Sequence, residues 1–372
     1  MRRRWAAALT FGLALAAFNG LAVAAAHRAP PLERVHYDWI RIGDPGNPPD
    51  TTVMASDRTT GYGSVAYPYR IGKYDVTNTQ YAAFLNAVAS TADPHLLFFP
   101  CMNRSQCYHE GSGIARTGGP GHYHYVVQPG RGQMPVNYVN LFSAMRFANW
   151  MNNGQGDAST EHGAYQLDGN GIIPTNLLEI RRTPGAKVFL PSENEWYKAA
   201  YWDPRKQRYY AYPAGSDRPM TCALPTAMPN TGNCGLVTAY ANPANPGIRG
   251  VAAWIWNDET PVGAYSGSPS PNGTYDQGGD VFQWTEDFTD AVIDQYQAGA
   301  AVAPLTDALD SLIGSPFNPG FGPLAVVRGT DFGDAGSYNA SSSRSCDIAA
   351  DPFETYGFRL AATIPSNTKE QR

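Results

Sequence analysis

The chain has five cysteines, which could form disulfides, bind a metal or react as free thiols. Cys101 and Cys107 lie close together in a loop-like stretch, and Cys222 and Cys234 enclose a loop rich in Pro and Asn. Both spacings suit small loops closed by disulfides, which form in oxidising compartments. No Cys-x-x-Cys pair occurs, which argues against a zinc site. Cys346 is left over, and we expect it to be a small buried apolar side chain rather than a reactive thiol.

Three histidines are a second group with chemical potential. His109, His122 and His124 fall in one region, and a His-x-His pair with a third His can hold iron or zinc. The surrounding residues are mostly Tyr and Gly, without the spacing of a metal-binding helix. We therefore expect these histidines to be exposed loop residues.

The N-terminus reads as a processing signal. Three arginines at 2–4 precede an apolar run at 5–17, and small-residue cleavage sites follow at 22–26. This order is typical of a secretory signal peptide, which we assign to residues 1–26. The alternative is a single membrane anchor, but Asn19 and Gly20 interrupt a stretch that is already short for a span. We expect a soluble periplasmic or secreted protein with no transmembrane segment after processing.

The composition of the chain argues against nucleic acids as partners. The chain has 372 residues with a net charge of −5, and loss of the three N-terminal arginines leaves 24 cations against 32 anions. An acidic protein without a basic stretch does not suit a nucleic-acid surface. The 38 Gly, 30 Pro and 22 Tyr, with only 16% charged residues, indicate long loops and short strands around aromatic side chains.

Local patterns predict about three main helices. Asn78 is expected to cap the first, the second begins near Asn140, and the third follows a capping box formed by Ser192 and Glu195. Short strands are expected at 67–71, 281–284, 324–328 and 356–361. The stretch 92–133 has neither a helical nor a strand period, so we expect a long irregular loop there.

Several segments, in order, resemble the sulfatase-modifying-factor domain of the formylglycine-generating enzymes. They lie at 74–86, 134–139, 190–200, 273–287, 327–329 and 357–360. The resemblance covers about 35–361 and leaves a C-terminal tail at 362–372. It implies an α+β, loop-rich fold with short strands, similar to a heavily decorated C-type lectin.

The resemblance also implies an activity, which the motif residues do not support. Enzymes of this family oxidise a substrate cysteine to formylglycine with molecular oxygen, using copper(I) held by two cysteines near the C-terminus. Soft thiolates suit Cu(I). Here the two positions fall near Asp334 and Asn339, and Cys346 is the nearest thiol. We therefore expect no copper site.

Calcium is a second cofactor that the resemblance implies. One structural calcium site of the family uses a loop that here contains Asp280 and Gln283, where the family has Asn and Glu. Oxygen donors stand at both positions, and Ca²⁺ prefers oxygen ligands. The alternative is a solvated turn in which Asp280 caps backbone N–H groups.

Two functional hypotheses follow. The first is a binding module for a peptide, protein or glycan, because a fold alone does not fix chemistry. The second is a divergent oxidoreductase of the formylglycine-generating type that acts on exported proteins, so whether the chain is an enzyme stays open. Arg359 is expected to anchor the fold through a buried carboxylate pair. The candidate ligand-binding residues are Trp284, Arg328, Asp334, Asn339 and Arg344.

Overall fold

The structure is a computed structural model that describes residues 34–103, 113–169, 171–235, 259–289 and 324–365. The chain divides into a short unit at 1–32 and a large unit at 33–372, and all described residues belong to the large one. The predicted signal peptide at 1–26, Cys107 and His109 lie outside the described residues. Within the described part, no helix is long and apolar enough to cross a membrane.

Three α-helices form where their capping residues predict them. Thr77 caps the first through a capping box with Gln80, one residue earlier than expected. Asn140 caps the second, and Ser192 with Glu195 caps the third as predicted. Such caps satisfy the N–H groups that the first helical turn leaves unbonded. The helices are α1 (Asn78–Val88), α2 (Leu141–Asn152) and α3 (Glu193–Tyr201), with 3₁₀ turns η1 (Pro100–Met102), η2 (Leu177–Glu179) and η3 (Gly336–Asn339).

Two four-stranded sheets form the centre of this unit. The first has the order β1-β2-β14-β5 and the second β12-β11-β10-β13. In the second sheet β10 pairs parallel with β13, and the other pairs are antiparallel. The strands are β1 (Trp39–Ile42), β2 (Tyr69–Gly72), β5 (Val188–Phe189), β10 (Phe282–Phe288), β11 (Leu324–Arg328), β12 (Ser345–Ile348), β13 (Tyr356–Phe358) and β14 (Ala361–Thr363).

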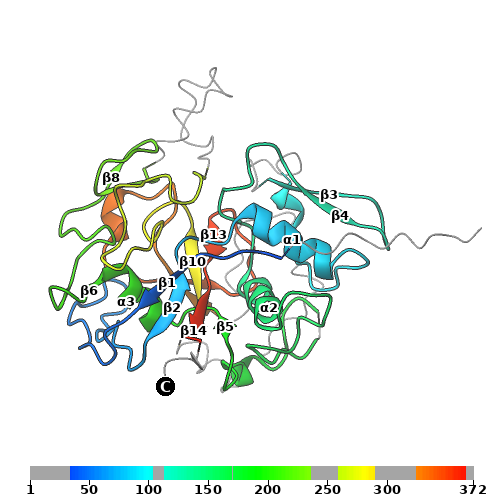
Figure 1. Ribbon diagram of the computed structural model, residues 1–372, viewed down its shortest axis with the longest axis horizontal. Helices are drawn as coiled ribbons and strands as arrows, with labels where there is room; N and C mark the ends of the chain where they lie inside the picture. Colours follow the sequence, from blue (N-terminus) through cyan, green and yellow to red (C-terminus); the bar gives the residue numbers. More distant parts are fainter. Residues whose placement is uncertain (1–33, 104–112, 170, 236–258, 290–323, 366–372) are drawn as a thin grey trace, which may run out of the picture. The chain divides into compact units, whose positions relative to one another are not determined.

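Helices cover these sheets with aromatic side chains. Figure 1 shows α1 and α2 together on one side of the sheets and α3 on the other. Phe147 of α2 contacts Phe84 of α1 and Phe358 of β13, each at a centroid distance of 5.3 Å. Edge-to-face packing of this kind adds to the stability gained by burying the rings. The α+β, loop-rich architecture with short strands and three helices is confirmed.

The region 92–133 corrects the prediction of a long irregular loop. It contains η1 and an antiparallel hairpin of β3 (Ile114–Thr117) and β4 (His124–Val127). β4 contacts α1, and Tyr125 packs into the core while its neighbours stay exposed. The strands were missed because each has only four residues, too few to establish an alternating pattern. His122 and His124 are exposed, as expected.

Candidate functional site

The loop that ends in η3 carries Asp334 and Asn339, the two positions to which the family resemblance assigns cysteines. Asp334 is partly buried, and its carbonyl oxygen accepts a hydrogen bond of 2.7 Å from the Gly235 N–H. Asn339 is only 1% exposed, and its Oδ1 accepts from the Thr330 hydroxyl at 2.5 Å. The Asn339 Nδ2 is buried without a hydrogen-bond partner. The loop therefore presents carboxylate and amide groups where the resemblance implies thiolates.

The described cysteines do not supply a thiolate pair. Cys222 and Cys234 form a disulfide, as predicted, and Cys101 is also disulfide-bonded. Cys346 is the free thiol of the described residues. It lies on β12 opposite Val326 and is exposed, which corrects the prediction of a buried side chain, because β12 is an edge strand with no neighbour on its outer side. Desolvation by the neighbouring side chains nevertheless raises the pKa of this thiol, which disfavours the thiolate that copper binding requires.

The Cys222–Cys234 disulfide lies against the η3 loop. It joins Cys222 of β8 (Thr221–Cys222) to Cys234, two residues after β9 (Thr231–Gly232), and β8 and β9 are short parallel strands. A Cβ atom added to Gly336 of η3 would lie 2.0 Å from the Met220 carbonyl oxygen and 3.5 Å from the Cys222 sulfur. Only glycine fits at such a close approach. The segment Met220–Cys222 therefore packs directly against η3, the turn that contains Asn339.

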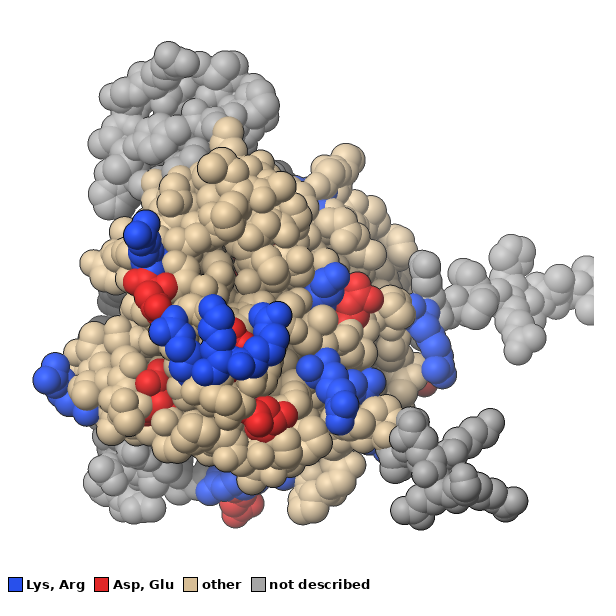
Figure 2. Space-filling model, turned by 60° about the vertical axis from the view of Figure 1, so that its left-hand side comes forward, with Lys and Arg blue, Asp and Glu red and all other residues tan. Residues whose placement is uncertain are grey.

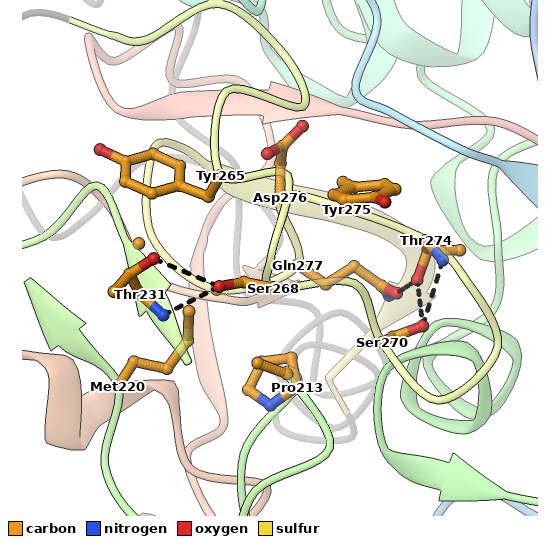
Figure 3. A pocket seen from close by; sticks show the side chains of 13 residues that line it. Pro213, Met220, Thr231, Tyr265, Ser268, Ser270, Thr274, Tyr275, Asp276 and Gln277 are labelled. Carbon is orange, nitrogen blue, oxygen red and sulfur yellow. Dashed lines mark hydrogen bonds between the residues drawn. The ribbon is translucent and has the colours of Figure 1, made fainter. Parts of the chain in front are cut away.

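A small pocket opens beside the disulfide-bonded strands (Figure 3). It encloses about 320 Å³ of space, including its open mouth. Ser270, Thr274 and Gln277 form one hydrogen-bonded side, and Thr231 bonds to Ser268 on the other. Gly278 lines the pocket and lies close to η3. A Cβ atom added to Gly278 would be 3.0 Å from Asn339 Oδ1. The lining also includes Pro213, Ala214, Met220, Gly232, Tyr265, Tyr275 and Asp276.

Asp276 gives this pocket a titrating group. Its Oδ2 accepts a hydrogen bond of 2.7 Å from the Gly263 N–H, and burial raises its pKa to about 6, against the opposing effects of that bond and of Arg359. A carboxyl group with a raised folded-state pKa stabilises the fold below its unfolded pKa near 4, and that stability is lost as pH rises through about 6.

We therefore predict that Asp276→Asn gains stability relative to the native chain as pH rises from 5 to 8. The amide keeps an oxygen for the Gly263 N–H but carries no charge. Thermal unfolding midpoints of both proteins at the two pH values test this, with the exposed Asp157→Asn as the matched control. A difference in midpoint between Asp276→Asn and the native chain that is the same at pH 5 and pH 8 would contradict the assignment.

The two residues of the predicted calcium site bond to different partners. Asp280 Oδ1 accepts from the Asn233 amide at 2.8 Å and from the Thr260 N–H at 2.9 Å. Gln283 Oε1 accepts from Trp196 and from Arg359, each at 2.6 Å. An oxygen that already bonds a guanidinium cation does not fit a Ca²⁺ ligand. The calcium site at Asp280 and Gln283 therefore stays a prediction, and in this structure both side chains bond to protein groups.

Trp284, Arg328 and Arg344 hold structural contacts. Trp284 is fully buried and donates to the Val139 carbonyl oxygen at 2.8 Å. Arg328 and Arg344 both donate to Glu193 Oε1 at 2.8 Å, and Arg328 is itself buried. Buried charges need partners of this kind. Of the candidate ligand-binding residues, Asp334 and Asn339 therefore lie on one loop. The other three bond to protein groups and hold the fold together.

Comparisons with known proteins find one family model and several similar solved structures. The family model of the sulfatase-modifying factor enzyme 1-like domain matches residues 62–364. Among solved structures, CarF has 20% sequence identity and a TM-score of 0.49, and the match covers 89% of this chain and 99% of CarF. PvdO from Pseudomonas aeruginosa has 16% identity and a TM-score of 0.42, with 88% of this chain and 92% of PvdO covered.

A third solved structure is similar to the same extent. Treponema denticola variable protein 1 has 17% identity and a TM-score of 0.44, with 90% and 97% of the two chains covered. No curated protein matches the sequence. The family model spans most of the chain and includes α1, α2, α3 and both central sheets from β2 onward. The chain therefore belongs to the sulfatase-modifying factor enzyme 1-like domain family.

Proposed function

We propose that this protein is an exported binding module of its family, with a peptide or protein as ligand, and that it lacks copper–thiolate oxidation. One observation carries the proposal. The two positions to which the family resemblance assigns copper-binding cysteines hold Asp334 and Asn339, while Cys222 and Cys234, which lie beside the η3 loop, are joined in a disulfide. Copper(I) prefers thiolates, and a carboxylate with an amide suits neither its softness nor its linear geometry.

The surface around the η3 loop supports a polypeptide ligand. Leu224, Met228 and Tyr338 are exposed, the last two by 66% and 59%. Leu224 and Met228 lie on the loop closed by the disulfide, and Tyr338 belongs to η3. On the face in Figure 2, Lys and Arg side chains gather across the middle, and the broad area above them is nearly free of charge. Exposed large apolar side chains on neighbouring segments are typical of protein-binding surfaces.

Two features of the chain support export, its N-terminal sequence and its disulfide. Residues 1–26 have the order of a signal peptide, and the Cys222–Cys234 disulfide is of the kind that persists in oxidising compartments. Mass determination of the protein isolated from its native host tests the first point, since cleavage near residue 26 is expected. An intact N-terminus would remove the export part of the proposal.

The central experiment separates binding from oxidation. The purified protein is loaded with Cu(I) and offered a Cys-x-Pro-x-Arg peptide in the presence of oxygen, and the thiol is followed by mass spectrometry. We expect no aldehyde product. The same protein is then screened on peptide and glycan arrays, where reproducible peptide binding is expected. Formation of formylglycine, or binding to glycans alone, would overturn the proposal.

The divergent oxidoreductase remains the second candidate because Cys346 is a free exposed thiol. Its raised pKa and the lack of a second thiol among the described residues both weaken this function. If Cys346 were the catalytic thiol, the native protein would oxidise the peptide and Cys346→Ser would not. We expect instead that the native protein and this variant are equally inactive.

A further inference from the structure

Basic side chains gather on a short hairpin and on the segment that follows it. In this hairpin, β6 (Trp202–Asp203) pairs antiparallel with β7 (Arg208–Tyr209). Between residues 204 and 230, four Lys and Arg residues stand against one carboxylate, although carboxylates outnumber these cations by 32 to 27 in the whole chain. A local excess of positive charge on an acidic protein attracts anionic groups. All four cations are exposed, and we call them the basic cluster: Arg205, Lys206, Arg208 and Arg218.

The protein neutralises only part of the charge of the basic cluster. Arg208 pairs with the exposed Asp217, and Arg205 Nε lies 3.5 Å from Oδ1 of the buried Asp203. Among the described residues, the other two cations of the cluster form no ion pair. They are therefore available to a carboxylate from outside the protein.

A tyrosine orders two of these long side chains before any ligand binds. The Lys206 ammonium lies 5.2 Å and the Arg208 guanidinium 4.3 Å from the centroid of the Tyr210 ring, and Lys206 also donates to the Tyr210 hydroxyl. Tyr210 is itself only 8% exposed, so its ring is fixed by packing. Cations held over an aromatic face lose less conformational entropy when a ligand binds.

An uncharged apolar loop adjoins the basic cluster. Residues 219–235 contain no charged side chain, and Leu224 and Met228 within them are 48% and 66% exposed. The Asn230 Nδ2 of this loop donates to the Arg218 carbonyl oxygen at 3.3 Å. The exposed apolar side chains of the loop and the cluster therefore belong to segments that bond to each other.

The η3 turn adjoins the same hairpin. Residues 335–343 also contain no charged side chain, and Tyr338 is 59% exposed. The Ser341 N–H donates to the Ala211 carbonyl oxygen, two residues after β7, at 2.8 Å. Figure 2 brings forward the side that carries β6 and β8 in Figure 1. Cations beside exposed Met and Tyr fit a protein partner, since Arg, Met and Tyr are enriched in protein interfaces.

We propose that this surface binds an acidic segment of a polypeptide ligand. Carboxylates of the ligand bond to Lys206 and Arg218, and an apolar side chain next to them packs against Leu224, Met228 and Tyr338. The inference rests on the proposed binding function and names the chemistry of its ligand. Hydrogen bonds between ionised groups are stronger than neutral ones, and salt weakens them at exposed positions.

The charge is tested with the full processed protein, its disulfides intact, and an unstructured peptide in which Asp and Glu flank a Leu-Tyr pair. Lys206→Gln/Arg218→Gln removes the two cations that form no ion pair. Arg41→Gln/Lys187→Gln removes two exposed cations beside the first sheet and is the matched control. At low ionic strength, titration calorimetry is expected to give about tenfold weaker binding for the cluster variant, a factor that corresponds to about 1.4 kcal/mol. The control variant should bind like the native protein.

The apolar part has its own pair of variants. Met228→Ser should weaken binding of the same peptide about fivefold, because a flexible apolar side chain is lost from the contact. Val126→Ser replaces an apolar side chain that is 43% exposed on β4, and it should leave the affinity unchanged. Equal affinities of these two variants would remove the apolar contact from the proposal.

Each remaining outcome bears on one claim. Equal affinity of the cluster and control variants, or equal affinity of the native protein for a peptide with Asn and Gln in place of Asp and Glu, would overturn the acidic ligand. Binding to phosphatidylglycerol vesicles without binding to the acidic peptide would overturn it as well. Peptide binding of another specificity would leave the proposed function standing. Absence of binding to any peptide on the arrays, or formation of formylglycine, would instead defeat the proposed function itself.

Discussion

Arg359→Met is expected to lower the free energy of unfolding by about 3–5 kcal/mol, the usual cost of breaking a buried ion pair. Arg359 is fully buried and donates to Gln283 at 2.6 Å, to Asp75 and the Tyr275 carbonyl at 2.8 Å, and to the Gly72 carbonyl at 3.1 Å. Methionine fills similar volume but leaves Asp75 buried without a cation. Chemical denaturation measures the loss.

Two further variants separate the charge from the packing. Arg41→Met, at an exposed position of β1, should change stability by no more than about 0.5 kcal/mol. Burial raises the pKa of Asp75 against the opposing effect of Arg359, so Asp75→Asn should recover part of the stability when it is combined with Arg359→Met. If Arg359→Met were no more destabilising than Arg41→Met, the ion pair would not be the anchor that joins β2 to the second sheet.

Removal of the Cys222–Cys234 disulfide has the second largest expected effect. The bond closes a loop with a sequence separation of 12, and bridges of this size contribute about 3 kcal/mol. Cys222→Ser/Cys234→Ser should therefore lower the thermal midpoint by several degrees. Because the Cys222 sulfur lies against Gly336, we also expect faster amide exchange in η3 than in α2 of the same variant.

Cys346→Ser is the matched control for this prediction. Its side chain is exposed on an edge strand and forms no disulfide, so its replacement should leave both the midpoint and the exchange of η3 unchanged. If the double variant showed native stability, the disulfide would not be what holds the η3 loop. If only the midpoint fell, its role would be global rather than local.

Much of the fold could be predicted because its signals are local. The capping box of Ser192 and Glu195 marks the start of α3, and Asn140 marks the start of α2. The disulfide between Cys222 and Cys234 followed from spacing and compartment. Each of these depends on residues close in the chain, where backbone geometry limits the alternatives.

The site could be predicted only in part because it depends on long-range packing. Asp334 and Asn339 were found through the family motif, but the contact between Gly336 and Cys222 joins segments far apart in sequence. Arg328 and Arg344 were expected to bind a ligand, but both pair with Glu193 of α3, a residue far away in the sequence.

The exposure of Cys346 was predicted wrongly for a similar reason. Cysteine is among the most buried residue types, so burial was the natural expectation. The structure places it on β12, the outer strand of its sheet. Sheet order is set by pairing between distant segments, and the strand pattern of Ser345–Ile348 is too short to reveal which face is covered.

Titration of the purified, oxidised protein with Cu(I) against a competing chelator tests the central claim most directly. We expect no tightly bound stoichiometric copper, and we expect Cys346→Ser to give the same titration curve as the native protein. One equivalent of tightly bound Cu(I) that Cys346→Ser loses would show that a thiolate site does form, and the protein would then be a copper enzyme of its family rather than a binding module.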